Sequence, residues 1–236
     1  MRVLSRHSTE YRVDLTTGEG LTEALAGCDV VVDATNDPSG RRATETLVEG
    51  SRRLLAAEDA AGVGHHVCVS IVGCDQVPVG YFRAKAGQER VVERGPVPWT
   101  IVRATQFHEL VAKTIEQLAR WRILPVPRVR LQTVAAIEVA RAVADVAGRP
   151  ARRSRMNVTG PELADARDIA RTWRSLTGRG ALLLPIRLPG KLGRVLREGV
   201  LTAEVPEVRG TTTFTEWLTG EREWAGTGPA HRSAGQ

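Results

Sequence analysis

A tyrosine and a lysine lie four residues apart in Tyr81-Phe82-Arg83-Ala84-Lys85, where a helix is predicted to begin. Residues at i and i+4 share one face of a helix, so the phenol and the ammonium can reach the same ligand. A nearby ammonium favours the phenolate, so we expect Lys85 to lower the pKa of Tyr81 and make it a general acid or base near neutral pH. Tyr81 and Lys85 are therefore candidate catalytic residues. The alternative is a surface helix whose tyrosine only packs.

Ser70 is the third candidate catalytic residue, because it lies near the end of a predicted strand over residues 66–72. Open α/β sheets bind their ligands at the carboxyl ends of parallel strands. A serine hydroxyl placed there could donate a hydrogen bond to a carbonyl oxygen.

The elements that must position these side chains form an alternating pattern. Short apolar runs alternate with amphipathic stretches over residues 1–150, which is typical of βαβ units in a parallel sheet. The pattern predicts strands at 3–4, 11–13, 30–34, 66–72 and 99–103, and helices at 21–26, 41–61, 82–94, 107–121 and 134–147. We expect one Rossmann-like domain, with helices on both faces of the sheet.

Residues 151–224 are expected to form a substrate-side segment of the same domain. They include a predicted helix at 162–176, a strand at 182–186 and a short helix at 190–199. The tail, 225–236, is rich in small and polar residues and has no apolar anchor, so it is predicted to be disordered.

Composition narrows the function classes. The net charge is +6 and the pI is about 9.9, but nearly all cations are arginines spread along the chain, which does not indicate a specific nucleic-acid partner. No apolar run reaches the ~18 residues of a membrane span, and no signal peptide is evident, so a cytoplasmic protein is expected. Cys28, Cys68 and Cys74 show no metal-ligand spacing, and no metal is predicted.

Several segments together resemble the NmrA-like atypical short-chain dehydrogenases/reductases. The similarity extends over most of the chain and is carried by residues 14–15, 25–31, 69–73, 81–89, 98–107 and 211–218. It implies NAD(P) as cofactor and a small-molecule substrate. It gives no indication of the oligomeric state.

The resemblance places Ser5 and Arg6 at the end of the family's second strand. An arginine there suits the 2′-phosphate of NADP, because a guanidinium pairs bidentately with phosphate. We therefore expect NADP rather than NAD. Arg6 as a plain surface charge is the alternative.

The remaining cofactor contacts are also implied by the resemblance. Asp14 lies where the family binds the adenine, and Ala34 and Thr35 lie where the chain passes the ribose. Lys85 lies where the ammonium holds the nicotinamide ribose.

One part of the family pattern is absent from this sequence. A family member has a strand, a Gly-x-x-Gly-x-x-Gly loop and a helix before the segment that matches Val3, and that loop binds the pyrophosphate. The missing strand would lie between Val3-Leu4 and residues 30–33, which would lose their ladder partners. An upstream start codon and a truncated product are the two explanations.

Three functions remain open from the sequence. One is an NAD(P)H-dependent oxidoreductase that acts on a small carbonyl or quinone-like substrate, with Gln106, Phe107 and His108 on the substrate side. The others are a non-catalytic NAD(P)-binding redox sensor or assembly factor, and an inactive truncated paralogue. His108 is either a proton shuttle or a wall residue. The interval from Ser70 to Tyr81 is short for the family's catalytic triad.

Overall fold

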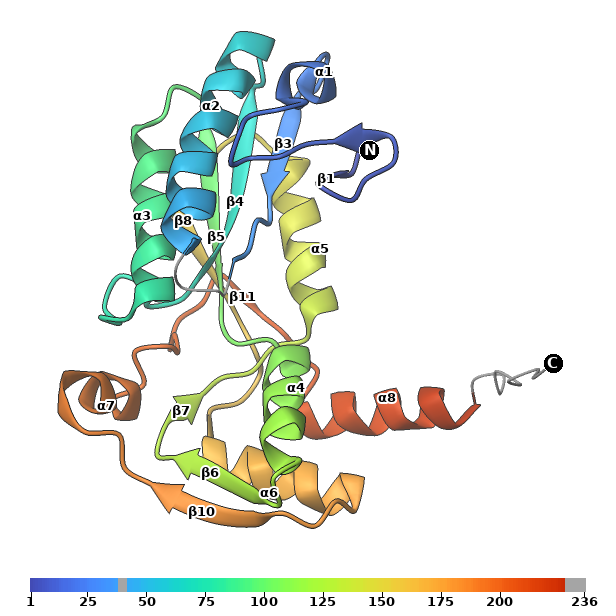
Figure 1. Ribbon diagram of the computed structural model, residues 1–236, viewed down its shortest axis with the longest axis vertical. Helices are drawn as coiled ribbons and strands as arrows, with labels where there is room; N and C mark the ends of the chain where they lie inside the picture. Colours follow the sequence, from blue (N-terminus) through green and yellow to red (C-terminus); the bar gives the residue numbers. More distant parts are fainter. Residues whose placement is uncertain (38–41, 228–236) are drawn as a thin grey trace.

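A computed structural model describes residues 1–37 and 42–227 and shows two lobes (Figure 1). The larger lobe contains a five-stranded parallel sheet, with strand order β11-β8-β5-β4-β3. Its strands are β3 (Val30–Asp33), β4 (His65–Ile71), β5 (Trp99–Ala104), β8 (Arg155–Thr159) and β11 (Val208–Arg209). The predicted Rossmann-like fold is confirmed.

Helices cover both faces of this sheet. The π-helix η1 (Thr44–Glu49), α2 (Gly50–Ala61) and α3 (Gly80–Arg94) pack together on one face, and α5 (Ala136–Ala147) lies on the other (Figure 1). Val67 of β4 and Ile101 and Val102 of β5 are buried, as expected for strands that are covered on both sides. The short helix α1 (Leu21–Leu25) packs against α2.

The N-terminal strands do not join the main sheet. β1 (Leu4–Ser5) pairs in parallel with β2 (Tyr11–Arg12), and this ladder is separate from the five-stranded sheet. β3 is consequently an edge strand, and among the described residues no strand pairs with its free edge. Val30 and Val32 are 37% and 44% exposed, although valines on a covered parallel strand are normally buried.

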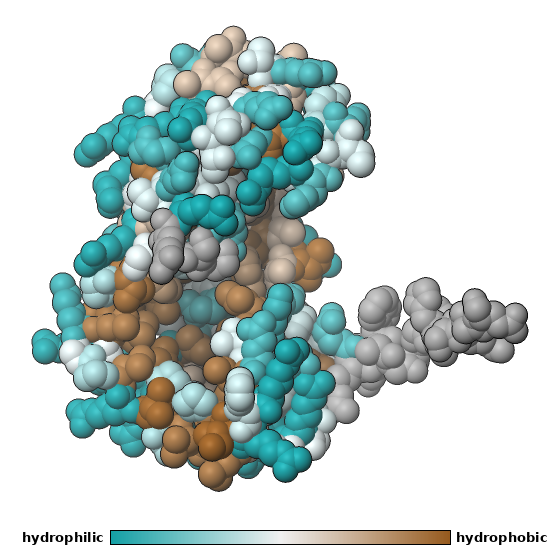
Figure 2. Space-filling model, viewed as in Figure 1, coloured by the Kyte–Doolittle hydropathy of each residue, from teal (hydrophilic) through white to brown (hydrophobic). Residues whose placement is uncertain are grey.

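The smaller lobe is built around a second parallel ladder. β6 (Ile123–Pro127) pairs with β10 (Leu182–Ile186), and α4 (His108–Ala119), α6 (Ala166–Thr177) and α8 (Phe214–Thr227) pack around a shared apolar core. The short strands β7 (Arg130–Leu131) and β9 (Ala164–Asp165) pair antiparallel, and α7 (Gly190–Arg197) follows β10. Figure 2 shows a hollow between the two lobes, with hydrophobic residues along the side formed by the smaller lobe.

Most predicted elements are present, but the short strands β7, β9 and β11 and the helix α8 were not predicted. Three other segments also differ. The single helix predicted over 41–61 is a π-helix followed by α2, and residue 41 lies outside the described part. β6 was not predicted, because two prolines interrupt its apolar pattern. The helix predicted over 162–176 begins only at Ala166, because Asp165 caps it by accepting a hydrogen bond from the Arg167 backbone N–H.

The predicted tail over 225–236 is described only as far as Thr227, where α8 ends. The remaining residues lie outside the described part of the chain. Within the described part, no helix is long and apolar enough to cross a membrane.

Candidate functional site

Lys85 links the carboxyl ends of β3 and β4 from its position on α3. Its Nζ donates hydrogen bonds to the carbonyl oxygens of Thr35 (2.9 Å) and Val69 (3.0 Å) and to Gln88 Oε1 (2.9 Å). An ammonium has three donors, so all three are used within the protein. Lys85 is only 4% exposed, and it would have to exchange a partner in order to hold a ribose.

Tyr81 reaches the same loop as Lys85. Its hydroxyl donates a 2.7 Å hydrogen bond to Oδ1 of Asn36, the residue after Thr35, whose carbonyl Lys85 binds. The i, i+4 spacing therefore brings both side chains to the segment that follows β3. Burial raises the pKa of Tyr81, so the expected lowering by Lys85 is wrong. The ammonium is committed to backbone carbonyls, and the phenol stays protonated at neutral pH.

Ser70 lies apart from this pair. It is buried at 3% exposure, and its Oγ donates a 2.6 Å hydrogen bond to Glu89 Oε1. We expected Ser70 to share an open surface with Tyr81 and Lys85. The structure does not bring the three side chains together there. Successive residues of a strand point to opposite faces, and this serine points beneath α3.

Glu89 is the centre of a buried charge network that the sequence analysis missed. Arg103 binds it through Nε (2.9 Å) and Nη2 (2.6 Å), and Arg155 Nε lies 3.5 Å from Oε2. Arg103 also lies 3.3 Å from Asp75. The signal available in the sequence was a charged residue within the apolar run of β5, because a buried charge needs a partner.

A second network surrounds Asp33 at the end of β3. Its Oδ1 accepts a hydrogen bond from the Thr35 N–H, and its Oδ2 accepts hydrogen bonds from Ser51 and Gln88. Burial raises the pKa of Asp33, but the charges of His66 and Lys85 and the Thr35 hydrogen bonds outweigh it and hold this pKa below its ordinary value.

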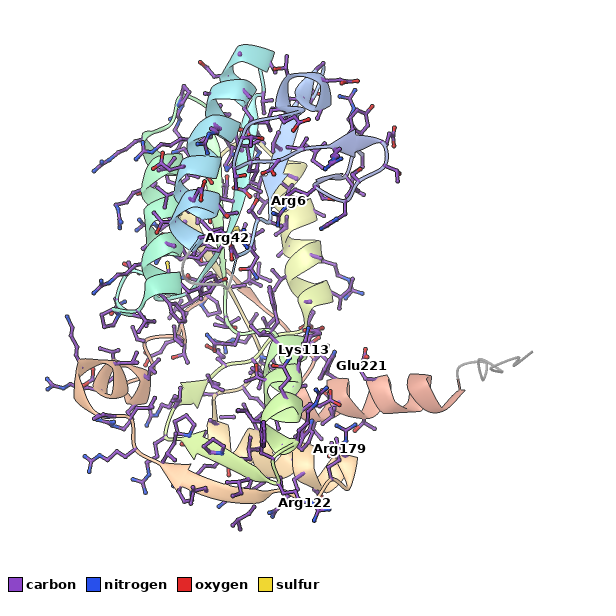
Figure 3. The ribbon with its side chains drawn as sticks, viewed as in Figure 1. Arg6, Arg42, Lys113, Arg122, Arg179 and Glu221 are labelled. Carbon is purple, nitrogen blue, oxygen red and sulfur yellow. The ribbon has the colours of Figure 1, made fainter. Side chains whose placement is uncertain are left out.

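The other predicted cofactor residues lie beside the separate N-terminal ladder and after β3. Ser5 and Arg6 are exposed at the end of β1, and Ala34 is exposed after Asp33. Figure 3 shows Arg6 on the lobe that carries the main sheet. Asp14 accepts hydrogen bonds from the backbone N–H and hydroxyl of Thr16, which lower its pKa.

These residues fit only part of an NAD(P) molecule. Arg6 forms no ion pair among the described residues, so its guanidinium is available to a phosphate. In contrast, residues 1–37 and 42–227 contain no Gly-x-x-Gly-x-x-Gly loop that could bind the diphosphate through backbone N–H groups. The described residues therefore include groups that could bind the adenosine part of NAD(P), but no such loop for its diphosphate.

The substrate-side residues lie where the two lobes meet. His108 is fully buried, its Nε2 lies 3.0 Å from the Thr212 carbonyl oxygen, and its ring packs on Phe214 and Trp217. Burial lowers the pKa of His108, which favours the neutral ring of a wall residue.

Gln106 and Phe107, which precede His108, make different contacts at the junction of the two lobes. Gln106 Nε2 donates a hydrogen bond to the Leu201 carbonyl oxygen, while its Oε1 is buried with no hydrogen-bond partner. Phe107 forms a parallel β-bridge with Val134 and packs with the apolar core behind α5.

The smaller lobe also has a basic cavity of about 420 Å³, which the sequence analysis did not identify. Its lining consists of Arg128, Arg167, Pro185, Ile186, Arg187 and Arg197. Among the described residues none of these four guanidinium groups has a carboxylate oxygen within 4.0 Å, and Arg167 Nε is buried with no hydrogen-bond partner. A second cavity of about 220 Å³ shares Arg167 and Pro185 with it.

Comparisons with solved structures support the fold. The quinone oxidoreductase QOR2 from Escherichia coli, complexed with NADPH, is 16% identical, with a TM-score of 0.73 over 90% of this chain and 83% of that chain. A nucleoside-diphosphate-sugar epimerase from Staphylococcus aureus is 17% identical, with a TM-score of 0.69 over 87% of this chain and 81% of that chain. The Bordetella bronchiseptica enzyme WbmG, in complex with NAD, is 16% identical, with a TM-score of 0.67 over 90% of this chain and 77% of that chain.

Sequence comparison identifies the family. No curated protein matches the sequence. A family model described as NAD(P)H-binding matches residues 5–150, which include β2 to β5 and all the predicted cofactor residues. Because this match spans more than half of the chain, the chain belongs to the NAD(P)H-binding family.

Proposed function

We propose that this protein is an NADPH-dependent oxidoreductase that reduces a small carbonyl or quinone-like acceptor. The observation that carries the proposal is the position of Tyr81 at the carboxyl edge of the sheet, where its hydroxyl reaches Asn36 on the loop after β3. Bound NADPH supplies a hydride. Reduction of a carbonyl also needs a proton, and a protonated phenol can donate it to the oxygen that becomes negative.

NADPH is preferred over NADH in this proposal because of Arg6. Its exposed guanidinium lies at the end of β1 and forms no ion pair within 4.0 Å among the described residues. Such a group attracts the 2′-phosphate that distinguishes NADPH.

The basic cavity favours an acceptor that carries a carboxylate or a phosphate. Four arginines surround it, while its lining contains no acidic residue. Guanidinium groups bind such oxyanions through paired, charge-assisted hydrogen bonds. The acidic group would lie in the smaller lobe, and the reducible group would lie toward the hollow between the lobes.

The test is NADPH oxidation with a panel of quinones, aldehydes and keto acids. Tyr81→Phe should abolish turnover of the accepted substrate and leave NADPH affinity, measured by titration calorimetry, nearly unchanged. Tyr11→Phe is the matched control and should retain turnover. Full turnover by Tyr81→Phe would remove Tyr81 as the proton donor.

A non-catalytic NAD(P)-binding protein is the second candidate. The observation that favours it is the engagement of Lys85 and Ser70 by protein partners, which leaves no assembled Ser-Tyr-Lys triad. Calorimetry would then show NADPH binding, while no acceptor in the panel would be reduced.

A further inference from the structure

Three buried side chains on the face of the sheet covered by α2 and α3 can bind one metal ion. One ligand atom each of Asp33, His66 and Cys68 lies within 4.8 Å of the other two. Asp33 is directly opposite Cys68 in the β3-β4 ladder, and His66 lies two residues before Cys68 on the same face. We propose that these three residues form a site for a divalent transition metal of the zinc class.

His66 already has the orientation of a metal-binding histidine. Its Nδ1 lies 2.9 Å from both carboxylate oxygens of Glu58, and both side chains are fully buried. Its Nε2 is also buried, and within residues 1–37 and 42–227 it has no hydrogen-bond partner. Metal-bound histidines usually donate their other ring N–H to a carboxylate, so Glu58 would fix the ring while Nε2 binds the ion.

Asp33 would exchange one hydrogen bond for a metal. A carboxylate has about four lone-pair positions, and four hydrogen bonds reach them, from the N–H and the hydroxyl of Thr35, from Ser51 and from Gln88. These donors come from the loop after β3, from α2 and from α3. They hold the carboxylate in place, so little order would be lost or gained when an ion binds.

Cys68 contributes the ligand that selects the metal. It is a free cysteine, and burial raises the pKa of its thiol well above the ordinary value, so without an ion it is protonated. A metal would bind it as the thiolate. A thiolate, an imidazole and a carboxylate together favour zinc or cobalt over magnesium and calcium, which prefer oxygen ligands.

The separations allow this assignment. Ligand atoms about 2.0 to 2.3 Å from one tetrahedral zinc ion lie about 3.3 to 3.8 Å apart, so movements of about 1 Å would close the triad around it.

The experiment uses the full chain without an affinity tag, stripped of metal and refolded with increasing cobalt, because the site is buried. We expect a thiolate-to-cobalt charge-transfer band in the near ultraviolet that saturates at one ion per chain. Cys68→Ser should remove this band. Cys74→Ser, which changes another buried free cysteine outside the triad, should keep it.

A second measurement covers the case in which Cys68→Ser does not fold. X-ray absorption of the unmodified chain loaded with zinc should show one sulfur ligand together with nitrogen and oxygen ligands. Absence of the cobalt band, or a zinc shell without sulfur, would overturn the proposal. The inference does not depend on NADPH or on any acceptor, so its outcome is separate from that of the proposed function.

Discussion

The two lobes differ in how they use charged side chains. In the larger lobe, buried Lys85 and Glu89 are fully engaged by neighbouring elements, with separations as short as 2.6 Å. In the smaller lobe, Arg167 and Arg187 line a cavity without an acidic partner among the described residues. The comparison indicates that the first set fixes the geometry of the sheet edge, whereas the second leaves its interactions available to a ligand.

The largest effect on stability is expected for Lys85→Met, which tests whether the engaged charges of the larger lobe hold the fold together. It would leave two carbonyl oxygens and Gln88 Oε1 without a donor and would remove a positive charge that stabilises buried Asp33. Loss of one partner from such a buried set costs about 3 to 5 kcal/mol. Urea denaturation measures the free energy of unfolding.

Lys113→Met is the matched control for that variant. Lys113 is exposed on α4 (Figure 3), so its loss should change the free energy of unfolding by less than about 0.5 kcal/mol. Equal effects of the two substitutions would show that the Lys85 contacts contribute nothing in solution.

A smaller loss in the free energy of unfolding is expected for Ser70→Ala. The hydroxyl donates to the buried Glu89 carboxylate, and a hydrogen bond to a charged group contributes about 1.5 to 3 kcal/mol. Arg103 and Arg155 remain on Glu89, which favours the lower part of that range. Ser175→Ala on the exposed face of α6 is the control. A loss of turnover without a loss of stability would instead place Ser70 at the substrate.

The pH dependence of stability sharpens the comparison further. Burial lowers the pKa of His66, but the Glu58 carboxylate outweighs it and raises this pKa, so the His66 contribution to stability is fully present below about pH 6.5, the unfolded value. The contribution falls as the pH rises through the higher folded pKa, by at most about 1.4 kcal/mol per pH unit. Urea denaturation of the metal-free protein across this range should show the decline.

His66→Gln should flatten this profile, because an amide can still donate to Glu58 but does not titrate. Asp33 acts at the other end of the scale. Its pKa is lowered in the fold, so its contribution is present above its unfolded pKa and is lost in acid. A profile of His66→Gln as steep as that of the parent would assign the decline to another group.

The smallest effect on stability is expected for Arg187→Gln in the basic cavity. Arg187 is exposed and unpaired among the described residues, so the free energy of unfolding should change by less than about 0.5 kcal/mol. Affinity for inorganic phosphate should instead fall roughly tenfold or more, because a charge-assisted hydrogen bond is lost. Arg141→Gln on exposed α5 should alter neither quantity, and unchanged phosphate affinity in Arg187→Gln would contradict the role of the cavity.

Much of the larger lobe could be predicted because its signals are local. Buried strands such as β4 and β5 contain the apolar runs Val67-Cys68-Val69 and Ile101-Val102, and the glycines at 62 and 64 mark the end of α2. The expected loss of a ladder partner is found at β3, which lies at the edge of the described sheet and exposes Val30 and Val32. The β6-β10 ladder could not be predicted, because its strands are short, rich in proline and far apart in the chain.

The sequence alone determined the parallel α/β fold and the helix that carries Tyr81 and Lys85. It also determined that these two side chains lie on one helix face and can reach the same group. These follow from backbone periodicity and from the neighbours of each residue along the chain. Only the tertiary structure decided that Ser70 faces Glu89, that His66 meets Asp33 and Cys68, and which arginines surround the cavity. Such partners depend on strand register and on helix packing between distant segments, which local patterns do not encode.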